Sequence, residues 1–138
     1  MSGNVLLDTC AAIWITEGEK MSDEAEATLD ESVDGGLDVM LSPMTAWEVG
    51  MLVARGRYSI SMTVQAWFER VVGRPNTALS DLTPSILIQS SFLPGNPPSD
   101  PFDRVFIATA REHGYRIMTR DSKILAYAEQ GHVQAIPC

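Results

Sequence analysis

The chain has 138 residues, of which 45% are apolar and 20% are charged, and its formal net charge is −8. This composition excludes disordered, collagen-like and coiled-coil proteins, and the length is sufficient for one domain over residues 1–138. Its 2 cysteines match no disulfide or zinc framework, and no apolar run approaches the roughly 20 residues that cross a bilayer, so we expect a cytoplasmic protein without a membrane partner.

The negative charge is concentrated between Glu17 and Asp38. This segment holds nine acids and one base, Lys20, whereas the rest of the chain holds nine acids and nine bases. A solvated helix face is the simpler interpretation of the segment, and an acidic docking surface is the alternative. If other acids are clustered in a metal site, the remaining surface is net basic, so the net charge does not exclude a nucleic-acid partner.

Apolar runs and helix signals alternate along the first half of the chain. They predict a strand at 4–7, a helix at 9–17, a helix capped by Ser22 that ends at Gly35-Gly36, a buried strand at 39–41 and a helix from Pro43 to Gly56. In the second of these helices, Ala25, Leu29 and Val33 form the expected apolar face. Ser42-Pro43 combines an N-cap with proline in the first helical turn.

The second half continues the alternation. It predicts helices at 63–72, from 83–84 through 88, at 102–113 and at 121–130, with strands at 77–82, 116–119 and 133–136. Strands separated by helices form parallel sheets, because a parallel connection must cross over the sheet. The sequence therefore predicts an α/β protein with three layers, α/β/α, around a central parallel sheet.

Acidic residues follow the predicted strands. Asp8 comes directly after the first strand, and Asp121 follows the strand at 116–119 after one residue. Glu48 lies in the helix after the second strand, and Asp103 lies in the first turn of the helix opened by Pro101. Ligands of open parallel sheets bind at the carboxyl ends of the strands, so we expect these four carboxylates to share one cleft.

Each acid also has a structural interpretation. Asp8 and Asp121 can be helix N-caps, Asp103 can be a favourable first-turn acid, and Asp100 has the position of an N-cap ahead of Pro101. Glu48 is harder to explain this way, because it lies in an apolar helical run and a carboxylate there needs water, a partner or a metal. Four converging carboxylates repel one another unless a divalent cation neutralises them, and all-oxygen ligands select Mg²⁺ or Mn²⁺.

Four segments that carry these acids resemble the PIN-domain family, and most closely its VapC-type toxin ribonucleases. The segments are Asn4-Val5-Leu6-Leu7-Asp8-Thr9, Glu48 after Ser42-Pro43, Asp100-Pro101-Phe102-Asp103-Arg104-Val105-Phe106-Ile107-Ala108-Thr109-Ala110, and Thr119-Arg120-Asp121. The resemblance covers nearly the whole chain and implies a PIN-like fold.

The resemblance also implies a function and a site. It implies a toxic endoribonuclease that uses Mg²⁺ or Mn²⁺ and metal-activated water to cut RNA, leaving a 3′-hydroxyl and a 5′-phosphate. Asp8, Glu48, Asp103 and Asp121 would then be both the catalytic and the metal-binding residues. Supporting roles fall to the hydroxyls of Thr9 and Thr119 and to Asp100.

The partners implied by the resemblance are an RNA substrate, a cognate VapB-type antitoxin and a second copy of the chain in a homodimer. We expect an apolar groove with an acidic floor for the antitoxin, lined by Trp47, Met51, Leu52 and Tyr58, although helical spacing alone does not separate groove from core. Five arginines are candidates for phosphate contacts, although a single arginine is more often solvated or salt-bridged: Arg55, Arg57, Arg70, Arg74 and Arg104.

Three alternative functions remain from the sequence. A noncatalytic PIN-like module would bind RNA or protein without cutting, and a housekeeping PIN nuclease would cut without an antitoxin. A phosphatase of the haloacid-dehalogenase type also has an aspartate after its first strand, but it needs a second one two positions later, where this chain has Cys10.

Overall fold

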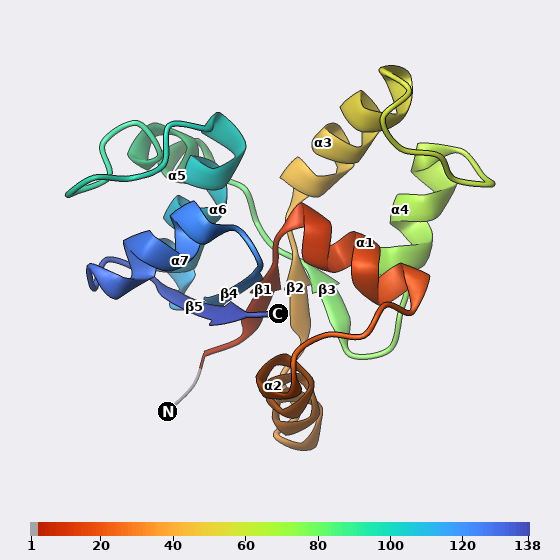
Figure 1. Cartoon of the computed structure of the whole chain (residues 1–138), viewed down its shortest axis with the longest axis horizontal. Helices are drawn as coiled ribbons and strands as arrows, with labels where there is room; N and C mark the ends of the chain where they lie inside the picture. The colour runs from red at the N-terminus through yellow and green to blue at the C-terminus, as the bar shows by residue number, and fades with distance from the viewer. Residues whose placement is uncertain (1–2) are drawn as a thin grey trace.

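The computed structural model of the chain describes residues 3–138, and its centre is a five-stranded sheet (Figure 1). The strands are β1 (Val5–Leu7), β2 (Val39–Leu41), β3 (Thr77–Leu79), β4 (Arg116–Thr119) and β5 (Gln134–Pro137). Their order across the sheet is β3-β2-β1-β4-β5, and every pairing between neighbours is parallel. The first strand is therefore central, with β2 and β4 on its two sides.

Seven helices connect the strands within the described residues. They are α1 (Thr9–Glu17), α2 (Asp23–Asp34), α3 (Pro43–Ala54), α4 (Val64–Val72), α5 (Pro84–Gln89), α6 (Pro101–His113) and α7 (Ser122–Glu129). The expected elements are all present. The strand expected at 77–82 is shorter, and the last strand lies one residue further along than expected.

Side chains that alternate along β1 divide the core between the two faces of the sheet. Val5 and Leu7 pack into one cluster with residues of α1, α2 and α4, whereas Leu6 packs into a second cluster with residues of α6 and α7. Successive side chains of a strand point to opposite faces, so the sheet lies between two helical layers. The expected three-layer α/β/α fold is confirmed (Figure 1).

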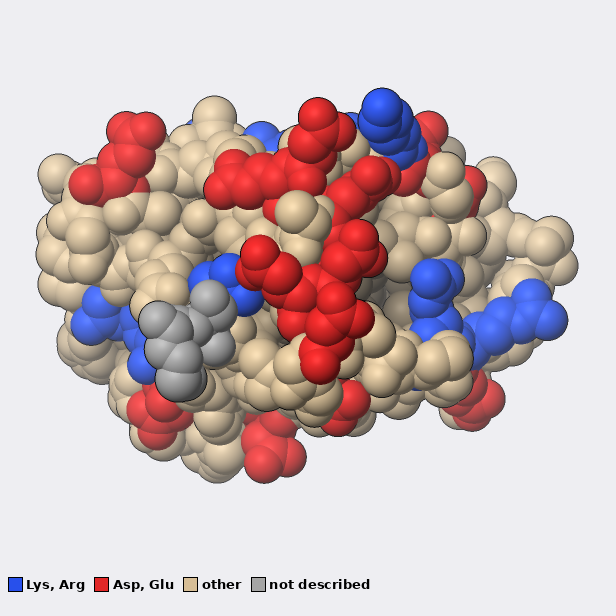
Figure 2. All heavy atoms as spheres, turned by 90° about the horizontal axis from the view of Figure 1, so that it is seen from below, with Lys and Arg blue, Asp and Glu red and all other residues tan. Residues whose placement is uncertain are grey.

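Helix α2 lies wholly within the acidic segment, and all the acids of this helix are exposed on the surface. Figure 2 shows these side chains gathered on the face seen from below. They are Asp23, Glu24, Glu26, Asp30, Glu31 and Asp34. The apolar face expected for this helix is only partly covered, because Ala25 is buried but Val33 is 44% exposed.

No helix within residues 3–138 has the length and apolar character that a membrane span requires.

Candidate functional site

Asp8 and Asp121 are brought together because β1 and β4 are neighbours in the sheet. Leu7 pairs with Met118, so both strands end at the same edge. The Thr119 hydroxyl donates a hydrogen bond to Oδ2 of Asp8 over 2.5 Å and accepts one from the backbone N–H of Asp121 over 2.9 Å. This buried threonine therefore fixes both aspartates relative to each other.

Three of the aspartates are also helix N-caps. Oδ1 of Asp8 accepts from the N–H of Ala11 over 2.8 Å. In the same way Asp100 caps α6 and Asp121 caps α7, again each through Oδ1. The structural interpretation of these residues is thus correct, but it does not oppose a role in a site, because each carboxylate oxygen has two lone pairs and one hydrogen bond engages only one of them.

Glu48 is held by the start of α1. The Thr9 hydroxyl donates to Oε1 of Glu48 over 2.5 Å and lies 3.3 Å from the Thr45 hydroxyl. Thr9 and Thr45 are buried, and Glu48 is half-buried. The contact ties α3 to the first turn of α1, so it positions the Glu48 carboxylate near Asp8.

Asp103 completes the group from the first turn of α6. Its neighbour Phe102 packs edge to face on Trp47 of α3, with ring centroids 5.0 Å apart. Such an aromatic pair stabilises the contact beyond the burial of its surface. It therefore helps to hold the helix of Asp103 against the helix of Glu48.

The electrostatics show that the carboxylates share one region. Burial and then the negative charges of Asp121, Asp100, Glu48 and Asp8 raise the pKa of Asp103 from 3.8 to about 7. Burial also raises the pKa of Asp8 and of Glu48, while the hydroxyls of Thr119 and Thr9 act in the opposite direction. Burial and then the charges of Asp8, Glu48 and Asp121 raise the pKa of the nearby Cys10 thiol to about 11.

The donor chemistry of this region fits a hard divalent cation. Its side-chain donors are carboxylate oxygens, which Mg²⁺ and Mn²⁺ prefer, and their mutual repulsion is the kind of energy that a cation relieves. Within residues 3–138, however, no group of three or more Asp, Glu, His or Cys side chains is placed closely enough to hold a metal ion. The carboxylates are gathered at one edge but do not converge on one point.

The structure also places the residues expected to line the antitoxin groove and the phosphate-contact candidate Arg104. Of the residues expected to line the antitoxin groove, Trp47 is 60% exposed and packs on Phe102 of α6. Leu52 and Tyr58 instead pack on the first core cluster. Arg104 donates hydrogen bonds to the carbonyl oxygens of Ser90 and Pro98, so it braces the loop before α6 and is not free to contact phosphate.

Sequence reasoning missed Thr45 and the environment of Arg120. Thr45 precedes Glu48 by one helical turn, so helical spacing already places both on one face. The Arg120 guanidinium lies 3.8 Å from the ring centroid of Trp14 and donates to the carbonyl of Lys20. No local pattern indicates that contact, because it joins residues about a hundred positions apart.

Residues 5–130 match the model of the PIN domain, so the chain belongs to the PIN domain family. It is similar to Ribonuclease VapC22 of Mycobacterium tuberculosis, with 27% identity over 124 residues, which cover 89% of this chain and 91% of that protein.

Solved structures show the same fold. The crystal structure of FitAcB from Neisseria gonorrhoeae matches with a TM-score of 0.57 and 22% identity over 96% of both chains. The structure of FitAB bound to an IR36 DNA fragment matches with a TM-score of 0.55 and 22% identity, covering 96% of this chain and 94% of the other.

Proposed function

We propose that the protein is the toxic endoribonuclease of a toxin–antitoxin pair and depends on Mg²⁺ or Mn²⁺. The observation that carries this proposal is the group of carboxylates at the carboxyl edge of the sheet, with the pKa of Asp103 raised to about 7. Membership in the PIN domain family and the similarity to a protein named Ribonuclease VapC22 support RNA as the substrate.

The residues of the site have separate tasks in this proposal. Asp8, Glu48 and Asp103 would hold the cation directly or through water, and Asp121 would complete the site or orient water. Thr119 and Thr9 keep the carboxylates of Asp8 and Glu48 in fixed orientations through their hydrogen bonds, with Asp100 as a further charge. When bound, a divalent cation supplies the positive charge that activates water for in-line attack on a phosphodiester, which leaves a 3′-hydroxyl and a 5′-phosphate.

The proposal includes two protein partners. A VapB-type antitoxin would restrain the nuclease, with a basic side chain opposite the carboxylates. A second copy of the chain would cover the exposed apolar side chains between β3 and α6, where Leu87, Ile88 and Phe92 are 44%, 62% and 80% exposed. Large apolar side chains grouped on a surface are typical of protein interfaces.

The test is cleavage of a structured RNA by the purified chain with Mg²⁺, with Mn²⁺ and with excess EDTA, followed by mapping of the product ends. We expect cleavage with either metal, none with EDTA, and products with 5′-phosphates. RNA binding without cleavage under every metal condition would contradict the proposal and favour the noncatalytic module. Cleavage without growth arrest on expression would favour a housekeeping nuclease.

A further inference from the structure

Arg120 lies in the turn between β4 and α7, directly between two residues of the carboxylate site. On one side, the hydroxyl of Thr119 donates to Oδ2 of Asp8, and on the other, Asp121 donates its N–H to that same hydroxyl. Arg120 itself is exposed. The turn that fixes the two aspartates therefore also carries a positive charge at the surface.

The Arg120 side chain is held by α1 and by the segment that follows this helix. Its guanidinium lies over the ring of the half-buried Trp14, 3.8 Å from the ring centroid, and donates to the carbonyl oxygen of Lys20 over 3.1 Å. A guanidinium is attracted to the face of an indole ring because that face is electronegative. The Lys20 carbonyl is neutral and the indole covers one face of the guanidinium, so the charge and the opposite face stay available to a ligand.

Arg104 lies near the same edge of the sheet but is engaged more fully. It is half-buried, and its guanidinium donates to the carbonyl oxygens of Ser90 and Pro98. A guanidinium has five N–H groups, and exposed Arg120 gives one of them to a carbonyl oxygen. Arg120 therefore has more donors and more open surface for a ligand than Arg104.

The Arg120 stack and the carboxylates lie along the same helix, α1. Asp8 caps this helix, and Cys10 and Trp14 share one of its faces because they are four residues apart. The Cys10 thiol has its pKa raised by burial and then by the charges of Asp8, Glu48 and Asp121, so this face begins beside the carboxylates. At roughly 1.5 Å per residue, Trp14 is about 9 Å from Asp8 along the helix. A bound strand can thus reach both places.

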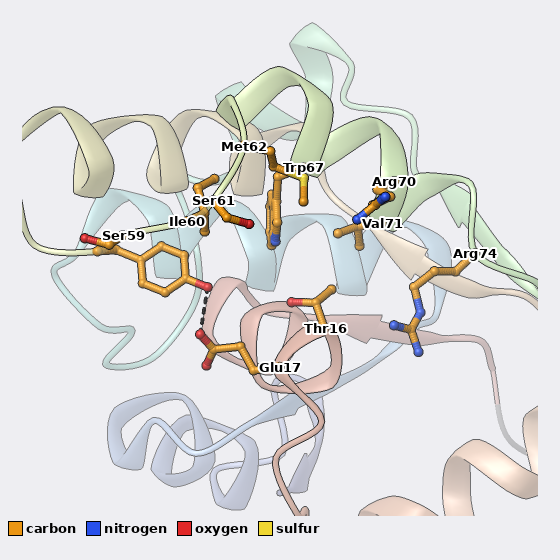
Figure 3. Close-up of a pocket in the computed structure, with 11 residues that line it drawn as sticks. Thr16, Glu17, Ser59, Ile60, Ser61, Met62, Trp67, Arg70, Val71 and Arg74 are labelled. Carbon is orange, nitrogen blue, oxygen red and sulfur yellow. Dashed lines mark hydrogen bonds between the residues drawn. The ribbon is translucent and has the colours of Figure 1, made fainter.

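The end of α1 is also fixed on its other side. Thr16, two residues after Trp14 and nearly opposite to it around the helix, lines a cavity of about 440 Å³ between α1, the loop after α3, and α4 (Figure 3). There the Tyr58 hydroxyl donates to Oε2 of Glu17 over 2.9 Å (Figure 3). Because the helix end is held from two sides, a ligand of Arg120 has little of this region left to order, which favours binding.

We propose that Arg120, held on the ring of Trp14, binds an RNA phosphate that flanks the scissile bond and so guides the strand across the carboxylates. The choice of RNA rests on the proposed function. The carboxylates repel the phosphates of the strand, and a fixed guanidinium nearby offsets this repulsion through charge-assisted hydrogen bonds. Every nucleotide carries the same phosphate, so the contact strengthens binding without selecting a base.

The test is binding of a mixed-sequence single-stranded RNA of about twenty nucleotides, longer than a typical single-strand site, to the full-length protein in EDTA. Fluorescence anisotropy gives the affinity over a series of salt concentrations. We expect Arg120→Gln to bind about tenfold more weakly at low salt, with the slope of log affinity against log salt smaller by roughly 0.7, the value for one phosphate contact.

Arg74→Gln is the matched control for the loss of one charge. Arg74 is exposed and precedes β3, and because the strands are parallel it lies at the edge of the sheet opposite to the carboxylates. This variant should change neither the affinity nor the slope.

Two further variants separate binding from support of the fold. Arg120→Lys keeps the charge but not the planar guanidinium, so we expect an unchanged slope and a smaller loss of affinity, and this variant replaces Arg120→Gln if the latter does not fold. Trp14→Leu together with Arg120→Gln should bind no more weakly than Arg120→Gln alone, because the indole acts through the guanidinium.

Three outcomes would overturn the inference: equal losses in Arg120→Gln and Arg74→Gln, a salt slope that Arg120→Gln leaves unchanged, or additive losses in the double variant. Cleavage of RNA by the wild type in Mg²⁺ is measured on the same preparations. Cleavage with any of these outcomes rejects only this inference. Binding that depends on Arg120 without cleavage rejects the nuclease proposal and retains the RNA contact, whereas a wild type that neither binds nor cleaves RNA rejects both.

Discussion

The Asp8 carboxylate has two roles that can be separated by one substitution. Its Oδ1 caps α1, and its Oδ2 receives the Thr119 hydroxyl. Asn keeps a cap oxygen but removes the charge. For Asp8→Asn we expect cleavage of RNA to fall by about a hundredfold or more, with the fold intact by circular dichroism. Asp38→Asn, at an exposed acid outside the site, is the control. A folded Asp8→Asn variant with full activity would remove Asp8 from the mechanism.

Asp103 gives a pH-dependent prediction for the metal-free protein. Its pKa is about 7 in the folded chain and 3.8 ordinarily, so between about pH 4 and 7 the folded state holds a proton that the unfolded state has lost. The free energy of unfolding therefore falls as the pH rises through this window. Asn does not ionise, so the free energy of unfolding of Asp103→Asn does not fall for this reason as the pH rises.

The measurement is the thermal midpoint of both proteins in EDTA. We expect Asp103→Asn to melt roughly 3–6 °C above the wild type at pH 8 and near it at pH 4.5. Equal midpoints at pH 8 would show that the neighbouring carboxylates do not destabilise the ionised Asp103.

Thr119 is the buried hydroxyl that joins the two strand ends. Thr119→Val keeps the shape but leaves Asp8 and the N–H of Asp121 without this partner. We expect the free energy of unfolding in urea to drop by about 1–3 kcal/mol. Thr119→Ser restores the hydroxyl and should recover most of the loss. A stable Thr119→Val variant would mean that water replaces the hydroxyl.

At the scale of elements, Arg104 connects α6 to the loop before it. Its guanidinium bonds to the carbonyl oxygens of Ser90 and Pro98, and more distantly to that of Ser91. A lysine has one donor group and cannot span these carbonyls as a planar guanidinium does. The loop before α6 thus depends on one side chain.

For Arg104→Lys we expect about tenfold faster hydrogen exchange of the backbone amides at 90–100, because the loop opens more often. Exchange in β1 and β4 should stay unchanged. Arg57→Gln, at an exposed position, serves as the charge control. Unchanged exchange at 90–100 would show that the prolines alone order the loop.

At the scale of the whole molecule, the exposed apolar side chains between β3 and α6 offer a test of the proposed dimer. Phe92 is 80% exposed and Ile88 is 62% exposed. If a second copy covers them, Ile88→Glu places a charge in the interface and yields a monomer by light scattering. Val33→Glu alters an exposed apolar side chain on α2 instead and should leave the dimer intact. A wild type that is monomeric at all concentrations would contradict the dimer.

Local signals determined most of the elements. Ser42 caps α3 ahead of Pro43, and Asp8, Asp100 and Asp121 cap their helices as their positions in the sequence indicate. These signals act within three or four residues, which is why the element bounds could be predicted. The acids at the strand ends could be predicted as well, because parallel strands end at one edge.

Only the tertiary structure determined which neighbours cover each helix and strand. Trp47 has the spacing of a buried residue but is 60% exposed, whereas Val71, equally apolar, lines a cavity. The strand order puts β1 between β2 and β4, and this order brings Asp8 near both Glu48 and Asp121. Helical periodicity states that a helix has an apolar face but not which neighbour covers it, because covering depends on contacts between residues far apart in the chain.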